Sequence, residues 1–148
     1  MSENTETILV VDDEPTDREM LRSILHRQDY HVIAASDARQ AMKLAEKYSE
    51  EVNLLITDVS LPGTNGCELA TAALRMLPDL KILFVSGYTG AEIFRYYGIP
   101  FTDMHFLRKP FTSADLSNRV RQVLNSAEPL QIAIEPGDDI PDMRSDRK

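Results

Sequence analysis

The chain has 148 residues, of which 43% are hydrophobic and 27% charged, and its formal net charge is −8. This length suits one domain with a buried core. No apolar run reaches membrane-spanning length, and the acidic balance argues against direct nucleic-acid binding, which needs a basic face. A single cysteine excludes an internal disulfide and fits a reducing compartment. We therefore expect a cytoplasmic protein, not associated with membranes, whose partners are proteins or metal ions.

The first half of the chain predicts three strands separated by two helices. The strands are short apolar runs at residues 8–11, 30–35 and 52–57. A helix is expected from Pro15 to about Asp29, and a second one is expected to start after Asp37, a residue type that caps helices well. At helical spacing, the inner face of the first helix comprises Met20, Leu21, Ile24 and Leu25.

The second half repeats this alternation. A loop rich in proline and glycine at 61–66 leads into a third helix, and a fourth strand is predicted at 80–85. A short helix near 91–97 precedes a fifth strand at 104–108. Thr112 opens the last helix, with Asp115 three residues later as a capping-box variant.

Five strand–helix alternations predict an α/β fold. The expected architecture is a doubly wound, five-stranded parallel sheet with helices on both faces and the flavodoxin-like strand order 2-1-3-4-5. Residues 7–126 are expected to form this domain. Residues 1–6 are expected to be a flexible N-terminus, and the acidic, proline-containing segment 127–148 is expected to be a disordered tail.

Four of the five predicted strands deliver a polar side chain to the same edge of the sheet. Asp12 and Asp13 follow the first strand, and Asp58 ends the third. Ser86 ends the fourth strand, and Lys109 follows the fifth. Each residue alone has an ordinary explanation, such as a cap, a turn or a surface charge. Because ligands bind at the carboxyl ends of parallel strands, the full set indicates a functional site.

The residue types indicate phosphoryl transfer assisted by a divalent cation. Three gathered carboxylates require a cation or protons, and a hard divalent ion with oxygen ligands, Mg²⁺ (or Mn²⁺), fits them. We expect Asp13 and Asp58 to bind the metal directly, Asp12 directly or through water, and the Ser60 carbonyl to add an oxygen. Asp58 is then the phosphoacceptor nucleophile, while Lys109 and the hydroxyl of Ser86 contact the phosphoryl oxygens.

On these motifs the chain resembles the receiver domains of bacterial two-component response regulators. The resemblance covers about residues 6–126 and lies in the ordered set Val10-Val11-Asp12-Asp13-Glu14, Asp58 with Leu61-Pro62 and Gly66, Ser86-Gly87, and Lys109-Pro110-Phe111. The stretch SGYTG…FLRKPF is similar to receivers of hybrid histidine kinases. Two departures are visible: Ser86 stands where threonine is commoner, and Phe106, at the aromatic switch position, has no hydroxyl.

The resemblance implies a signalling switch and not a conventional enzyme. Asp58 would accept phosphate from a histidine kinase or phosphotransfer protein, and the chain would catalyse only its own phosphorylation and dephosphorylation. Movement of Ser86 and Phe106 would then alter the surface of the fourth helix, fifth strand and fifth helix for a protein target or a second copy. The Lys109–Pro110 bond is often cis in this family.

Two alternatives from other classes share parts of this pattern. Haloacid-dehalogenase-type phosphohydrolases also use an aspartate nucleophile with Mg²⁺, but in an Asp-x-Asp pattern after the first strand, where this chain places Pro15 after Asp13. A flavodoxin-like FMN carrier needs a phosphate-cradling loop at that point, and an acidic loop would repel phosphate. The sequence does not name the kinase, the target, or whether the receiver acts alone, as a relay or within a longer protein.

Overall fold

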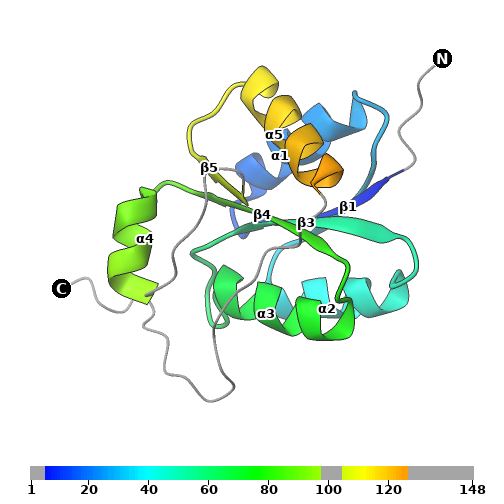
Figure 1. Cartoon of the computed structure of the whole chain (residues 1–148), viewed down its shortest axis with the longest axis horizontal. Coiled ribbons are helices and arrows are strands. Elements are labelled where there is room, and N and C mark those ends of the chain that lie inside the picture. The colour runs from blue at the N-terminus through cyan, green and yellow to red at the C-terminus, as the bar shows by residue number, and fades with distance from the viewer. Residues whose placement is uncertain (1–5, 98–104, 127–148) are drawn as a thin grey trace.

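The computed structural model describes residues 6–97 and 105–126. Within these ranges five strands alternate with five helices (Figure 1). The strands are β1 (Thr7–Val11), β2 (His31–Ala35), β3 (Val52–Asp58), β4 (Lys81–Ser86) and β5 (Phe106–Arg108). The helices are α1 (Pro15–His26), α2 (Ala38–Lys47), α3 (Gly66–Met76), α4 (Gly90–Tyr97) and α5 (Ser113–Asn125). The expected tail at 127–148 lies outside the described residues, as does nearly all of the expected N-terminal segment.

The strands form one parallel sheet in the order β2-β1-β3-β4-β5, which confirms the predicted fold. The register pairs Val11 of β1 with Thr57 of β3. The residues that follow these two therefore leave the sheet side by side. Further along, β4 pairs Ser86 with Arg108 of β5, which places Ser86 and Lys109 at the same edge.

Successive strand residues face opposite layers of helices. In β1, Ile8 and Val10 belong to a core cluster with α1 and α5, whereas Leu9 and Val11 belong to a second cluster with α2, α3 and α4. Figure 1 shows α1 and α5 on one side of the sheet and α2 and α3 on the other. Because both faces are covered, the central strand β3 is buried along most of its length, and its apolar residues are Val52, Leu54, Leu55 and Ile56.

Helix caps follow the sequence expectation at two helices. The side chain of Asp37 accepts the backbone N–H of Gln40 at 2.8 Å and so caps α2. Thr112 and Asp115 form a reciprocal capping box at the start of α5. These contacts satisfy backbone donors that the first helical turn leaves unpaired.

The first helix departs from the prediction in two ways. It ends at His26, before Asp29, whose φ of 70° lies in the left-handed region and cannot continue a helix. Met20, expected on the inner face, is 38% exposed. The buried stripe is centred on Leu21, Ile24 and Leu25, and at 100° per residue Met20 lies roughly 90° away from its centre. The predicted start of the fifth strand at Met104 lies outside the described residues.

No helix in the described part of the chain combines the length and the apolar character needed to cross a membrane.

The lone thiol gives a first test of the core. Cys67 is fully buried in α3, and burial raises the pKa of its thiol to about 12. Since the thiolate is the reactive form, we expect no reaction of the native protein with Ellman's reagent at pH 8. Protein unfolded in urea should release one equivalent of the chromophore. Rapid reaction of the native protein would contradict the burial of α3.

Candidate functional site at the edge of the sheet

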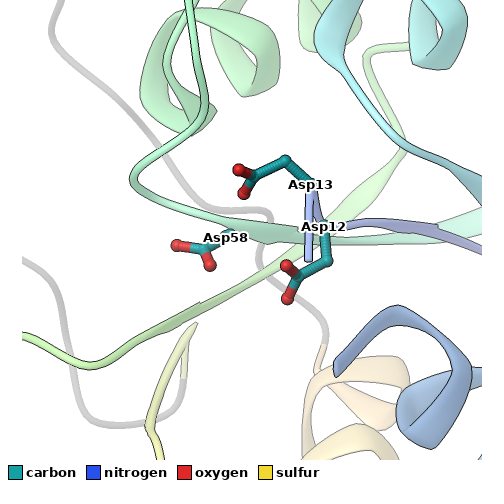
Figure 2. A group of neighbouring side chains, drawn as sticks. All are labelled: Asp12, Asp13 and Asp58. Atoms are coloured by element: carbon teal, nitrogen blue, oxygen red, sulfur yellow. The ribbon is translucent and has the colours of Figure 1, made fainter. Parts of the chain in front are cut away.

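Three carboxylates converge where β1 and β3 end. Asp12 and Asp13 follow β1, and Asp58 is the last residue of β3. One carboxylate oxygen from each residue lies within 4.8 Å of the other two. Figure 2 shows the three side chains as neighbours at the strand ends. The Asp12 side chain is fully buried and that of Asp58 is 13% exposed. The parallel register of β1 and β3 is what brings these side chains together.

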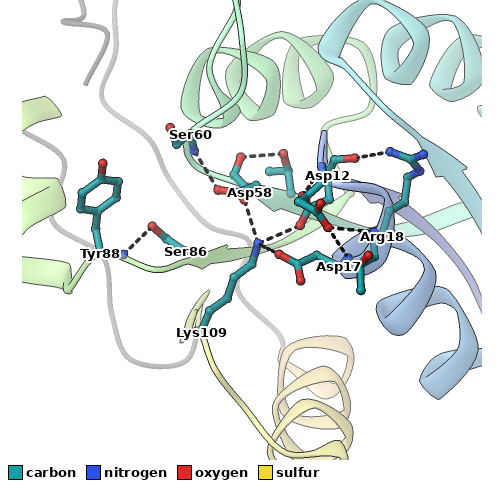
Figure 3. Close-up of polar contacts among 11 residues, drawn as sticks. Asp12, Asp17, Arg18, Asp58, Ser60, Ser86, Tyr88 and Lys109 are labelled. Carbon is teal, nitrogen blue, oxygen red and sulfur yellow. Dashed lines mark hydrogen bonds and ion pairs between the residues drawn. The ribbon is translucent and has the colours of Figure 1, made fainter. Parts of the chain in front are cut away.

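Lys109 follows β5, and its side chain extends from there to this cluster. Its Nζ lies 2.9 Å from Asp12 Oδ2, 2.9 Å from Asp58 Oδ2 and 3.0 Å from Asp17 Oδ2 (Figure 3). An ammonium group has three N–H donors, so each of them has one carboxylate partner. The Lys109 backbone N–H also donates to the Ser86 carbonyl at 2.8 Å, which fixes the start of the side chain against β4.

Burial and charge act against each other in this site. Burial raises the pKa of Asp12, although hydrogen bonds from Lys109 and from the Glu14 backbone N–H oppose the shift. Burial alone would lower the pKa of Lys109, but hydrogen bonds and charge attraction from Asp12 and Asp58 outweigh it, so the pKa of the ammonium is raised. Lys109 is therefore charged at neutral pH.

The carboxylates outnumber the single ammonium, and the chemistry of the donor set fits a divalent ion. Two carboxylates about 4 Å apart repel by roughly 4 kcal/mol at an effective dielectric near 20. Asp12, Asp13 and Asp58 offer only oxygen ligands, which hard cations such as Mg²⁺ prefer. The site can thus hold a cation beside Lys109.

Both oxygens of Asp58 are held by donors. Oδ1 accepts the Ser60 backbone N–H at 2.9 Å, while Oδ2 accepts Lys109. The Ser60 carbonyl, expected as a metal ligand, belongs to the same turn, but its role stays a prediction.

Ser86 and Phe106 occupy the positions that the sequence predicted for them. Ser86 ends β4, is fully buried, and its hydroxyl oxygen accepts the Tyr88 backbone N–H at 3.0 Å. Phe106 begins β5, is half-buried, and packs against the core cluster on the α2–α4 side of the sheet. Their parts in phosphoryl binding and switching stay predictions. The Lys109–Pro110 peptide bond is cis.

Sequence reasoning missed Asp17 and Arg18, which also contact the cluster. Arg18 Nη1 donates to the Asp12 carbonyl at 2.8 Å, and Asp17 pairs with Lys109. Both side chains come from the first turn and a half of α1. The available signal was helical spacing. Once α1 starts at Pro15, Asp17 and Arg18 lie in its first turn, on the side of the helix that faces the end of β1.

Gly66 lets α3 begin directly against the phosphoacceptor candidate. A Cβ atom at Gly66 would lie 2.0 Å from the Asp58 carbonyl oxygen and 3.0 Å from the Val59 Cα. Its N–H donates to the Val59 carbonyl at 2.8 Å, while Asn65 and Glu68 cap the helix reciprocally. No other residue type fits this approach without moving the backbone of Asp58.

Comparison with known proteins identifies a family for this chain. Residues 8–121 match the response regulator receiver domain. The chain is 32% identical over 121 residues to the aerobic respiration control protein ArcA of Escherichia coli (strain K12), covering 82% of this chain and 49% of ArcA. It is 32% identical over 120 residues to the response regulator receiver protein CpdR of Brucella abortus (strain 2308), covering 81% of this chain and 98% of CpdR.

A solved structure agrees. The receiver domain of the hybrid histidine kinase CckA superposes with a TM-score of 0.66 at 32% identity, over 80% of this chain and 98% of that one. The chain therefore belongs to the response regulator receiver family, a family of two-component signalling modules. It spans about half the length of ArcA and nearly all of CpdR.

Replacing Gly66 with alanine tests the close approach of α3 to Asp58. Because the added Cβ would meet backbone atoms, we expect Gly66→Ala to lower the free energy of unfolding by about 1–3 kcal/mol. The matched control is Gly90→Ala at the start of α4, where a Cβ meets nothing within 4 Å. That variant should be unchanged or more stable by up to about 1 kcal/mol. Urea unfolding measures both, and equal effects would contradict the contact.

Proposed function

We propose that the chain is a phosphorylation-activated switch in which Asp58 accepts a phosphoryl group from a phosphohistidine. The donor would be a histidine kinase or a phosphotransfer protein. The observation that supports this most directly is the placement of Asp58, whose carboxylate lies at the sheet edge between the Ser60 N–H and the Lys109 ammonium. Membership of the receiver family supports the same reading.

The proposed transfer is a displacement at phosphorus. An oxygen of the Asp58 carboxylate forms the new P–O bond while the P–N bond to the donor histidine breaks, and its electron pair stays on the imidazole nitrogen. Dephosphorylation is attack of water at phosphorus, which releases inorganic phosphate and returns the carboxylate. Apart from this reaction on itself, the chain is proposed to have no enzyme activity.

Mg²⁺ (or Mn²⁺) is proposed to be held by Asp12, Asp13, Asp58 and the Ser60 carbonyl. When bound, it offsets negative charge on the phosphoryl oxygens. Lys109 would place its ammonium against one phosphoryl oxygen. Ser86 already uses its oxygen as an acceptor for the Tyr88 N–H, which leaves the hydroxyl hydrogen to donate to another.

The response is proposed to be a change of the α4–β5–α5 surface. Phe106 at the start of β5 is half-buried and pairs in register with Phe84, so a further inward movement would bury it. On α4, Phe94 is 55% exposed and offers an apolar contact to a partner. Shifting such a switch from 1:99 to 99:1 needs about 5.5 kcal/mol of differential interaction. Hydrogen bonds to a phosphoryl group carrying nearly two negative charges are of this order.

The proposed receiver unit spans residues 7–126. Its output is a contact with a protein target or with a second phosphorylated copy of the chain. The acidic balance supports partners that are proteins, with no direct binding to nucleic acid or membrane. A cytoplasmic location fits such partners.

Substitution of the phosphoacceptor tests the central assignment. With acetyl phosphate and Mg²⁺, we expect the native chain to gain one phosphoryl group by intact-protein mass spectrometry and Asp58→Asn to gain none. The reason is that an amide oxygen cannot form the acyl phosphate. The matched control is Asp79→Asn, an exposed residue after α3, which should be phosphorylated like the native chain. Phosphorylation of Asp58→Asn to the native extent would refute the assignment.

Turnover separates a receiver from a phosphohydrolase with an aspartate nucleophile. Since a receiver is proposed to catalyse only the phosphorylation and dephosphorylation of its own aspartate, we expect p-nitrophenyl phosphate to be hydrolysed at no rate above buffer with Mg²⁺. Sustained release of p-nitrophenol, abolished in Asp58→Asn, would favour the phosphohydrolase instead.

A further inference from the structure

Asp17 holds Lys109 from outside the proposed metal cluster. Its Oδ2 lies 3.0 Å from Lys109 Nζ, and its side chain is 36% exposed. The carboxylates of Asp12, Asp13 and Asp58 gather within 4.8 Å of one another, whereas Asp17 is not part of that group. Figure 3 shows the Asp17 side chain reaching the ammonium from α1. Lys109 thus has two partners inside the cluster and one outside it.

The two inner partners have a conflicting task. The Oδ2 atoms of Asp12 and Asp58 each accept a hydrogen bond from Lys109 Nζ, yet both residues are also proposed to bind a divalent cation. A cation and an ammonium that share the same carboxylates repel each other at a few ångströms. Binding of the cation would therefore weaken the hold of the ammonium on Asp12 and Asp58.

The neighbours of Asp17 are already engaged elsewhere. The Glu14 carboxylate accepts the backbone N–H groups of Thr16 and Asp17, at 2.8 and 3.1 Å, and so caps α1. Arg18 donates to the Asp12 carbonyl. Asp17 itself lies in the first turn of α1, where the helix dipole favours a carboxylate. It is therefore the acid on α1 that is placed to keep Lys109 at the site.

We propose that Asp17 is a positioning residue that retains Lys109 when a divalent cation occupies the carboxylate cluster. The ammonium would shift toward Asp17 and stay within reach of Asp58, ready for a phosphoryl oxygen. Without Asp17, the ammonium would have to leave its two inner partners with no carboxylate to replace them. The inference rests on the proposed function in one respect, the assignment of Asp12, Asp13 and Asp58 as metal ligands.

A double-mutant cycle on Mg²⁺ binding tests this role. Dissociation constants would be measured by calorimetry for the native chain, Asp17→Asn, Lys109→Gln and the double variant. We expect Asp17→Asn to weaken Mg²⁺ binding roughly three- to ten-fold when Lys109 is present. In the Lys109→Gln background the same substitution should change the constant less than about two-fold, because no ammonium has to move. Equal weakening in both backgrounds would show a through-space charge effect and overturn the proposal.

Two further variants guard against other causes. Asp17→Glu keeps the carboxylate and should restore Mg²⁺ affinity to within about two-fold of the native value. Glu19→Gln removes one charge from the same helix at an exposed residue that pairs with Arg22, and it should leave the affinity unchanged. Urea unfolding of each variant without metal identifies any loss of fold. Failure of rescue by Asp17→Glu, or weakening by Glu19→Gln, would count against a specific contact.

Phosphorylation distinguishes failure of this inference from failure of the proposed function. At saturating Mg²⁺, Asp17→Asn should still be labelled on Asp58 by acetyl phosphate, at a reduced rate. If the native chain is labelled but the binding cycle is additive, only the role of Asp17 is wrong. If the native chain neither binds Mg²⁺ nor accepts label, both this inference and the proposed function are wrong.

Discussion

The structure depends on one ammonium group placed among carboxylates that would otherwise repel one another. Lys109 sits within 3.0 Å of three aspartates, two of which leave β1 and β3 side by side. Parallel register brings those acids together whether or not their charges favour it, because the register is set by the apolar residues of the strands. The lysine from the edge of β5 compensates part of this charge and joins strands that are far apart in the sequence.

The positions of the strand ends were predictable because each is fixed by a short apolar run. Alternation with helices predicts a parallel sheet, and 2-1-3-4-5 is the usual order when there are five strands. The convergence of Asp12, Asp13, Asp58 and Lys109 could therefore be expected before any contact was known. The capping residues Asp37 and Thr112 were predictable for a similar reason, since each satisfies a local need of its own helix.

Features that depend on helix rotation were harder to predict. Met20 is apolar and precedes the buried Leu21, yet its position around the axis of α1 directs its side chain toward solvent. Asp17 is an ordinary charged residue on a helix surface until the start of α1 is known to within a residue. One step of 100° separates a side chain aimed at the site from one aimed at water. The sequence pattern can identify the buried face of a helix, but it cannot assign the residues at the boundary of that face.

Strand β5, which leads into Lys109, is also the shortest in the sheet that the structure describes. It comprises three residues, paired with β4 alone, whereas β3 has seven and is paired on both sides. Fewer ladder hydrogen bonds mean that an edge segment opens at a lower free energy than the central strands, and its amide protons exchange sooner. The ammonium of Lys109 is therefore carried by an edge strand that can open by itself, whereas Asp12 and Asp58 are attached to central strands that open only with the whole domain.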